Sequence, residues 1–384
     1  MIHTDCDAFP GGEEFHLRSR LIIPIIVIQS FLFLVHWLIY ETWIHFWPTG
    51  ASAAKVLGIV FVFLALSFVS ASLLAFRSHH TLVRIFYTLA GVWLGTVNFL
   101  TWACGLCWLT LAVVRWTGVP VSRPEIVATF FGLALAASLY GVINAALVRV
   151  RRVTVKLPGL PETWRGRHAA LVTDTHLGHV RGHRFMVRIL RLLRQLQPDV
   201  VFISGDLFDG TRVDHQRLTL SWKNAAFPFG VFFVTGNHDE FSDSPEQITA
   251  ITQSGIRVLN NEKVTVDGLQ ILGVNYRDST DLMRLQSVLE QAGVDRTRAS
   301  ILLSHAPHGL TVVEQQGVSL QLSGHTHGGQ IFPFTWFTWR IFRQYTYGLQ
   351  QHGGLAVYTS SGAGTWGPPM RVGTKPEVVL LTFA

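Results

Sequence analysis

Charged residues are scarce in this chain of 384 residues. Asp, Glu, Lys and Arg make up 14% of it, whereas they account for about a quarter of an ordinary soluble domain. The shortage is local, because four long apolar stretches contain none of them: residues 21–40, 56–76, 85–114 and 126–148. The composition therefore argues against a chain that is a soluble globular protein throughout.

Cysteine is also rare. The chain has 3 Cys residues and none after Cys107, which excludes a disulfide framework from its C-terminal part. Cys104 and Cys107 form a C-x-x-C pair, a spacing that also occurs in redox and metal sites. Because the pair lies within the third apolar stretch, we favour ordinary helix packing over either of those roles.

The apolar stretches predict transmembrane helices. Each is long enough, since about 20 helical residues, rising about 1.5 Å each, cross the hydrocarbon core of a bilayer. The third is too short for two crossings and predicts one long helix. The leader before the first stretch carries four acidic residues and is not typical of a cleavable signal peptide: Asp5, Asp7, Glu13 and Glu14. We expect four spans within residues 21–150.

Basic residues between the spans predict the orientation. Arg18, Arg20, Arg77 and Arg84 lie on one side together with the cluster at 149–156, while only Lys55, Arg115 and Arg123 lie on the other. The positive-inside rule then places the tail, residues 1–20, and everything after residue 150 in the cytoplasm, as a multi-pass protein of the inner or plasma membrane. The net charge of +7 partly reflects Arg residues that would face lipid headgroups, so membrane lipids are the expected partners and nucleic acid is not.

The region 151–384 has a different pattern, in which short apolar runs are separated by Gly, Asp and His. The runs predict strands at 169–172, 200–203, 231–234, 269–274, 301–303, 319–322, 355–359 and 378–383, and a short β-branched segment at 153–157 precedes them. Apolar residues at helical spacing predict helices at 184–196 and 281–292. This alternation is typical of a layered α/β domain, so the chain combines a four-helix transmembrane region with an α/β domain.

Five short clusters of Asp, His and Asn follow predicted strands in this domain. They are D-T-H from Asp174, G-D-L-F-D from Gly205, G-N-H-D from Gly236, S-H-A-P from Ser304 and G-H-T-H-G-G-Q from Gly324. Oxygen and nitrogen ligands without a thiolate suit Mn, Fe or Zn. A carboxylate such as that of Asp206 can bridge two divalent cations, and such a pair holds a phosphoryl group for in-line attack. Taken singly, each cluster has an ordinary alternative, such as a helix cap, a turn or a core histidine.

In their order, the clusters give the domain a specific resemblance. From about residue 153 to the end it resembles the calcineurin-like metallophosphoesterase superfamily, whose motifs run D-x-H, G-D-x-x-D, G-N-H-D/E, a lone His and G-H-x-H. The longer G-H-T-H-G-G-Q, with S-G-A-G-T-W-G-P-P-M-R and K-P-E near the end, is similar to the bacterial membrane-associated branch. The resemblance implies two packed β-sheets flanked by helices.

The resemblance also implies a role for each motif residue. Asp174, His176 and His327 would hold a first metal, and Asp206 would be shared with a second metal held by Asn237, His305 and His325. A hydroxide between the metals would attack phosphorus directly. His238 would protonate the leaving alkoxide, and Asp209 would pair with His238 and orient its ring. The other histidines near the motifs, His179 among them, are expected at the surface.

Aromatic residues are concentrated in residues 331–347, directly after His327, and are interleaved with Arg340 and Arg343. This segment either enters the membrane interface and guides an amphipathic phosphorylated substrate, or forms an apolar helix packed on the domain. The expected function is that of a membrane-anchored phosphoesterase, and the rival is a membrane sensor or scaffold that uses the fold for binding. The sequence fixes neither the substrate, nor the native metal, nor the oligomeric state.

Overall fold

The computed structural model describes residues 11–241 and 245–384. The first ten residues of the expected tail therefore lie outside the described part of the chain. By contacts between residues the chain divides into two compact units. One contains the chain up to Leu73 and Thr96–Ala136, and the other contains Leu74–Gly95 and Ala137–Ala384.

Four long helices confirm the helices predicted from the apolar stretches. They are α1 (Gly11–Phe46), α2 (Ala51–Ala75), α3 (Thr81–Thr117) and α4 (Arg123–Ala146), and all four are long and apolar enough to cross a membrane. The third apolar stretch is indeed one helix, 37 residues long. Large apolar side chains such as Phe63, Leu109 and Leu139 are 60% or more exposed on these helices, as expected of surfaces that face lipid. Cys104 and Cys107 are buried free thiols within α3.

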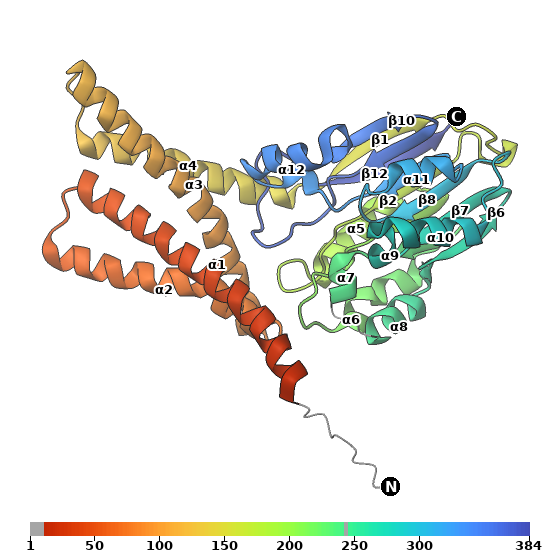
Figure 1. The fold of residues 1–384 in the computed structure, drawn as a ribbon, viewed down its shortest axis with the longest axis horizontal. Helices are drawn as coiled ribbons and strands as arrows, with labels where there is room; N and C mark the ends of the chain where they lie inside the picture. The colour runs from red at the N-terminus through yellow and green to blue at the C-terminus, as the bar shows by residue number, and fades with distance from the viewer. Residues whose placement is uncertain (1–10, 242–244) are drawn as a thin grey trace, which may run out of the picture. The chain divides into compact units, whose positions relative to one another are not determined.

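Two six-stranded sheets form the C-terminal domain (Figure 1). The first has the order β1-β12-β2-β3-β4-β5 and the second β10-β11-β9-β8-β7-β6. The strands of the first sheet are β1 (Arg149–Val155), β2 (His168–Val172), β3 (Val200–Ser204), β4 (Val231–Val234), β5 (Arg257–Val258) and β12 (Glu377–Phe383). Those of the second are β6 (Glu262–Val266), β7 (Leu269–Val274), β8 (Ser300–Ser304), β9 (Leu320–Ser323), β10 (Gly348–His352) and β11 (Leu355–Thr359).

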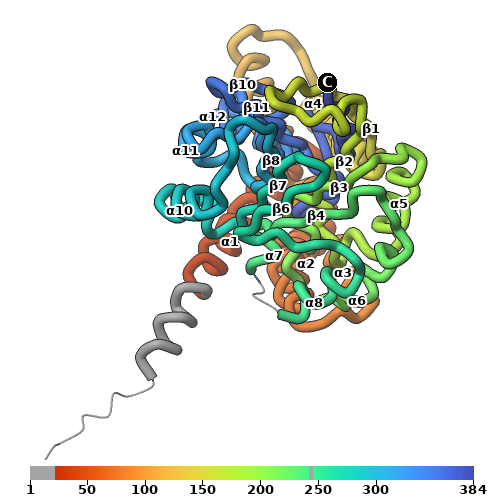
Figure 2. The backbone as a smooth tube through the Cα atoms, turned by 90° about the vertical axis from the view of Figure 1, so that its right-hand side faces the viewer, coloured from red at the N-terminus to blue at the C-terminus, as the bar shows by residue number. Residues whose placement is uncertain are grey.

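Three apolar layers hold the domain together. Leu171, Phe202, Ile301 and Leu322 belong to the cluster between the sheets. Because side chains alternate along a strand, the neighbouring residues of β2 and β3 face the other way and pack on α5 (His183–Leu196). The outer face of β7 and β8 packs on α10 (Leu282–Ala292) and α11 (Leu310–Gln315). Figure 2 shows α5 and α10 on opposite sides of the paired sheets.

The eight predicted strands and both predicted helices are present, with ends displaced by a few residues. Strands β1, β5, β6 and β10 were not predicted; β1 overlaps the β-branched segment at 153–157, and β5 is only two residues long. The other helices outside the membrane region are short: α6 (His215–Thr219), α7 (Asn237–Phe241), α8 (Pro245–Gln253), α9 (Tyr276–Thr280), α11 and α12 (Phe334–Phe342). Among these the sequence indicated only α12, as one of two alternatives for its segment.

All five motifs stand where a strand ends. They follow β2, β3, β4, β8 and β9 within two residues. Strands β2, β3 and β4 run parallel to one another, as do β8 and β9, so within each sheet their carboxyl ends lie at one edge. Side chains from both sheets can therefore meet at this edge, which is a common place for functional residues in layered α/β domains.

Candidate metal centre

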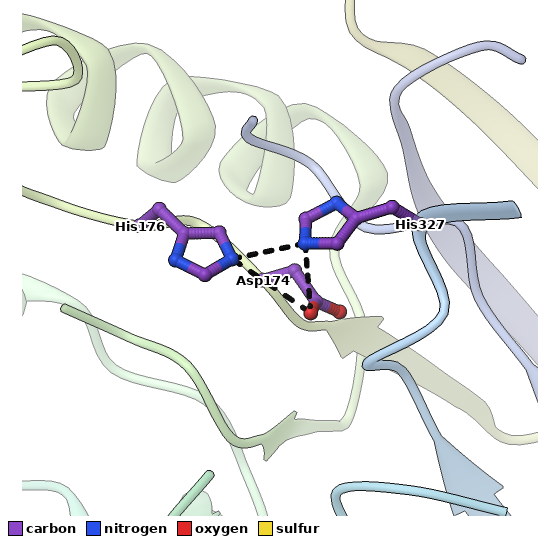
Figure 3. Close-up of side chains that lie close together, drawn as sticks. All are labelled: Asp174, His176 and His327. Carbon is purple, nitrogen blue, oxygen red and sulfur yellow. Dashed lines mark hydrogen bonds and ion pairs between the residues drawn. The ribbon is translucent and has the colours of Figure 1, made fainter. Parts of the chain in front are cut away.

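The first group of side chains brings together Asp174, His176 and His327 (Figure 3). The Nε2 atoms of His176 and His327 are 3.0 Å apart. Asp174 Oδ1 lies 3.4 Å from His327 Nε2 and 4.0 Å from His176 Nε2. All three residues are buried. Two nitrogen ligands of one ion, each about 2.1 Å from it, are commonly about 3 Å apart, so this spacing suits a shared cation.

Asp206 lies between this group and a second one. Its Oδ2 is 3.7 Å from His176 Nε2 and 3.1 Å from His305 Nε2. Its Oδ1 accepts a hydrogen bond from the backbone N–H of His238 at 2.9 Å. Asp206 therefore faces ligands of both groups, as a bridging carboxylate must.

The second group consists of His305, His325 and Asn237. His325 Nδ1 lies 3.0 Å from Asn237 Oδ1, and the rings of His305 and His325 meet edge to face with centroids 5.0 Å apart. The Nδ1 atom of His305 contacts the carbonyl oxygen of Ser204 at 2.8 Å, which directs Nε2 toward Asp206. Tyr276 packs against both imidazoles and closes this side of the site.

The backbone is strained at the predicted ligands. Five of them adopt positive φ angles between 46° and 70°: Asp174, His176, Asp206, His325 and His327. A non-glycine residue in this region costs about 1–3 kcal/mol and persists only where its surroundings enforce it. One such constraint is the backbone N–H of His325, which donates to both oxygens of Asp174 at 3.1 Å. Gly324 is required beside it, because a Cβ there would collide with the Asp174 carboxylate.

Burial sets the charges of the site. Burial lowers the pKa values of His176 and His325 to about 3, so both rings are neutral at pH 7 and able to bind metal. Burial also raises the pKa of Asp174 to about 6. Burial is also the largest single influence on Asp206 and opposes its ionisation, but the interactions with His305, His176 and His238 together outweigh burial and lower the pKa of Asp206.

These residues fit two divalent cations. Imidazoles and carboxylates converge with their donor atoms facing one another, and the described residues include three overlapping groups of at least three such donors within 4.8 Å. The buried Nε2 of His305 has no hydrogen bond of good geometry within the described residues, although an unsatisfied buried polar atom is costly. A metal at each group would satisfy these atoms, and Asp206 would be common to both.

His238 and Asp209 differ from expectation in one respect. The carboxylate of Asp209 accepts from the N–H and hydroxyl of Thr211 and from the N–H of His179, and it is the backbone carbonyl of Asp209 that lies 3.1 Å from His238 Nδ1. The cause is the turn after β3, which directs the side chain toward Thr211. His179, expected at the surface, is buried there and contacts the Thr211 hydroxyl.

A carbonyl accepts but does not donate, so the contact with Asp209 places the proton of His238 on Nδ1 and leaves Nε2 toward the site. His238 also lies close enough to His176 and Asp206 to be counted with them as a group of donors.

Three residues beside the site were missed by sequence reasoning. Asp239 is buried, and its carboxylate accepts from the N–H groups of Gly236 and Phe208 at 2.9 and 3.0 Å, which ties together the turns after β3 and β4. Trp366 lies 5.6 Å from His238 by ring centroids. Asp239 stands inside G-N-H-D, and Trp366 stands inside the G-T-W-G-P-P-M-R segment, so both signals were present without an assigned role.

Arg371 is the third and has no surface exposure. Its guanidinium donates to the carbonyl oxygens of His327 at 2.8 Å and of Ser361 and Gly364 at 2.7 Å each. Burial lowers the pKa of Arg371 to about 10, so the side chain remains charged at pH 7. Arg371 therefore fixes the backbone that carries a predicted metal ligand.

An Arg371→Met variant should bind metal about 10–100-fold more weakly, because groups that orient ligands usually contribute this much to metal affinity. The measurement is a titration of metal-stripped protein against a competing chelator, with the thermal unfolding temperature recorded separately. Arg284→Met is the control, since Arg284 is exposed and pairs with Asp278 on the surface. Equal affinities of the two variants would contradict the positioning role.

The fold and this constellation define the domain as an α/β sandwich with a dinuclear metal centre. A sequence model of the family described as calcineurin-like phosphoesterase matches residues 168–329, a range that contains all seven predicted ligands. The C-terminal domain therefore matches this superfamily.

Relatives carry the same description. An uncharacterized metallophosphoesterase of Campylobacter jejuni is 31% identical over 251 residues, covering 64% of this chain and 66% of that protein. A transmembrane protein with metallophosphoesterase domain from Danio rerio is 33% identical over 276 residues, covering 67% of this chain and 62% of that protein. The matched parts thus span slightly less than two thirds of these relatives. A crystal structure of a dimetal phosphatase from Danio rerio aligns with 51% of this chain and 87% of its own, at 13% identity and a TM-score of 0.33.

Proposed function

We propose that the chain is a membrane-anchored, dinuclear metal-dependent phosphoesterase that hydrolyses a phosphate ester or pyrophosphate bond. The observation that carries the proposal is the convergence of seven donor side chains from five strand ends, with Asp206 facing both groups. The metals, when bound, would supply the positive charge that stabilises the phosphoryl group in the transition state and activates water. Hydrolysis adds water to phosphorus, breaks the bond to the leaving oxygen and gives that oxygen a proton.

His238 supports the last step. Its Nδ1 is held by the carbonyl of Asp209, so a protonated ring can donate from Nε2 to the leaving oxygen. The ring of His238 also packs against the rings of His176 and Trp366, with centroids 4.9 and 5.6 Å away. These contacts fix the direction of the acid while leaving it beside the metal groups.

We also propose that the domain faces the cytoplasm, on the basis of the basic residues between the spans. The loop between α2 and α3 belongs to the same compact unit as the metal centre. Arg84 Nε donates to the carbonyl of His179, and Arg212 donates to that of Arg77. The connections with the most basic residues, at 77–84 and 149–156, thus belong to one compact unit. This supports placing both on the same side of the membrane, the side rich in Lys and Arg.

Removal of metal should reduce the activity to the background rate. We expect the purified full chain to contain two divalent ions, to hydrolyse at least one class among soluble phosphomonoesters, phosphodiesters and pyrophosphates, and to lose this activity on chelation. Readdition of Mn²⁺ or Zn²⁺ should restore it. The measurement combines elemental analysis with the substrate screen. Full activity after complete demetallation would contradict the proposal, and metal binding without hydrolysis of any class would favour the sensor or scaffold.

A further inference from the structure

The helix α12 has an unusual surface. It contains Phe334, Trp336, Phe337, Trp339, Ile341 and Phe342, yet none of its residues is buried. The first five of these apolar side chains are 49% to 72% exposed. A contiguous exposed apolar surface of this kind usually marks an interaction site rather than a water-facing one.

The segment that contains α12 carries charge of one sign. Residues 315–376 contain no Asp or Glu. The guanidinium of Arg340 lies 5.6 Å from the ring of Trp336, and that of Arg343 lies 5.4 Å from Trp339. Tryptophan beside arginine is the combination found where proteins meet lipid headgroups, with indole at the interface and guanidinium near phosphate. Charge complementarity thus favours an anionic lipid surface as the occupant.

The surface leads to the metal centre. The last residue of α12, Phe342, contacts His325 with ring centroids 6.1 Å apart, and His308 at 5.5 Å. On another side of the site, Trp366 is 57% exposed beside His238. A molecule bound along α12 would therefore reach the second metal group, and Trp366 stands beside the acid.

The same surface is joined to the membrane helices. The backbone N–H of Phe332, just before α12, donates to the carbonyl of Val372 at 2.9 Å. A Cβ added to Gly141 of α4 would lie 2.9 Å from Val372 Cγ2, and one added to Gly91 of α3 would lie 3.3 Å from Pro369 Cδ. These are contacts within one compact unit, so Val372 and Pro369 lie directly against α4 and α3.

The length of α4 indicates the depth of this contact. From Arg123 to Gly141 the helix rises about 27 Å at about 1.5 Å per residue. The hydrocarbon core that it must cross is about 30 Å thick. If Arg123 lies at one boundary of the hydrocarbon core, Gly141 therefore lies near the opposite boundary. Val372, which touches Gly141, is then at the level of the lipid headgroups, and α12 begins beside it.

We propose that α12 and Trp366 form a surface seated in the headgroup layer, and that the substrate is a lipid phosphodiester. Its apolar chains remain in the bilayer while its phosphate enters the metal centre along α12. The substrate class rests on the proposed phosphoesterase function, whereas the membrane contact of α12 does not.

Two substrates with the same scissile bond test the substrate class. They are the p-nitrophenyl phosphodiesters of ethanol, which is soluble, and of hexadecanol, embedded in phosphatidylethanolamine and phosphatidylglycerol vesicles that contain the full chain. The Trp336→Ser/Phe337→Ser/Trp339→Ser variant should lower the ratio of embedded to soluble turnover about tenfold or more, since each aromatic anchor contributes to interfacial binding. An unchanged ratio would overturn the substrate class.

The matched control is Leu282→Ser/Met283→Ser, which removes two exposed apolar side chains from α10 in the same domain. Its ratio should equal that of the unmodified protein. A fall of the same size in this control would show a general effect of apolar surface and overturn the assignment to α12.

The depth of α12 is tested without any activity. A nitroxide on Phe337→Cys, in a chain whose three cysteines are replaced, should collide more with lipid-dissolved oxygen than with a water-soluble nickel chelate. Preference for the nickel chelate would overturn the membrane contact, and shielding from both reagents would show a protein partner instead. If neither diester is cleaved by metal-loaded protein, phosphodiesterase activity and the lipid phosphodiester assignment both fail, while the nitroxide result still decides the position of α12.

Discussion

The Asp206→Ala variant should hydrolyse no phosphate ester above the background rate and should retain little of either metal. Asp206 Oδ2 faces His305 and His176 in different groups, at 3.1 and 3.7 Å, so its removal takes a ligand from both metals at once. The loss should be about a thousandfold or more, because groups that act as a unit are not replaced by their neighbours. No other single substitution in the site is expected to have a larger effect.

The Asp206→Ala measurement needs two readouts. Elemental analysis should show fewer than two ions per chain, and the rate with the best soluble ester should fall to background. Asp295→Ala is the control, because Asp295 is a surface carboxylate that pairs with Arg298. Retention of two ions and of activity by Asp206→Ala would rule out a bridging role.

The His238→Gln variant should show a loss that depends on the leaving group. With an alkyl ester, whose alkoxide needs a proton, the rate should fall about 10²–10⁴-fold, the usual contribution of a general acid. With a p-nitrophenyl ester the loss should be small, because nitrophenolate leaves without protonation. The measurement is kcat/KM for a pair of esters that differ only in the leaving group.

Asp209→Asn is the companion variant for this test. Since the ring of His238 contacts the backbone carbonyl of Asp209 and not its carboxylate, Asp209→Asn should leave the leaving-group dependence intact. Equal losses of His238→Gln on both esters, accompanied by loss of metal, would instead identify His238 as a ligand beside His176 and Asp206.

Local sequence was sufficient for the parts of the fold that depend on local patterns. Apolar length predicted the four membrane helices, and short apolar runs ending in Gly, Asp or His predicted the strands that carry the motifs. Strand β5 was missed because two residues carry no periodicity. For the segment of α12 the sequence left two alternatives, a segment in the membrane interface and an apolar helix packed on the domain, and the structure shows a helix with no buried residue.

The details of the site depend on contacts distant in sequence and could not be predicted in the same way. Arg371 acts on His327 across 44 positions, and only the folded chain shows which carbonyls its guanidinium reaches. The orientation of Asp209 was expected from the resemblance, yet a hydroxyl two residues away, on Thr211, attracts its carboxylate. Short-range competition of this kind is decided by turn geometry, which the sequence motif does not specify.

The left-handed backbone at the predicted ligands sets stability and activity against each other. Glycine adopts such angles at no steric cost, so Gly in place of Asp174 or His327 would relax the chain locally and deprive the metals of a donor. Selection for a more robust fold alone would therefore erode the site. Aspartate and histidine at these positions keep the metal donors at a cost in backbone strain.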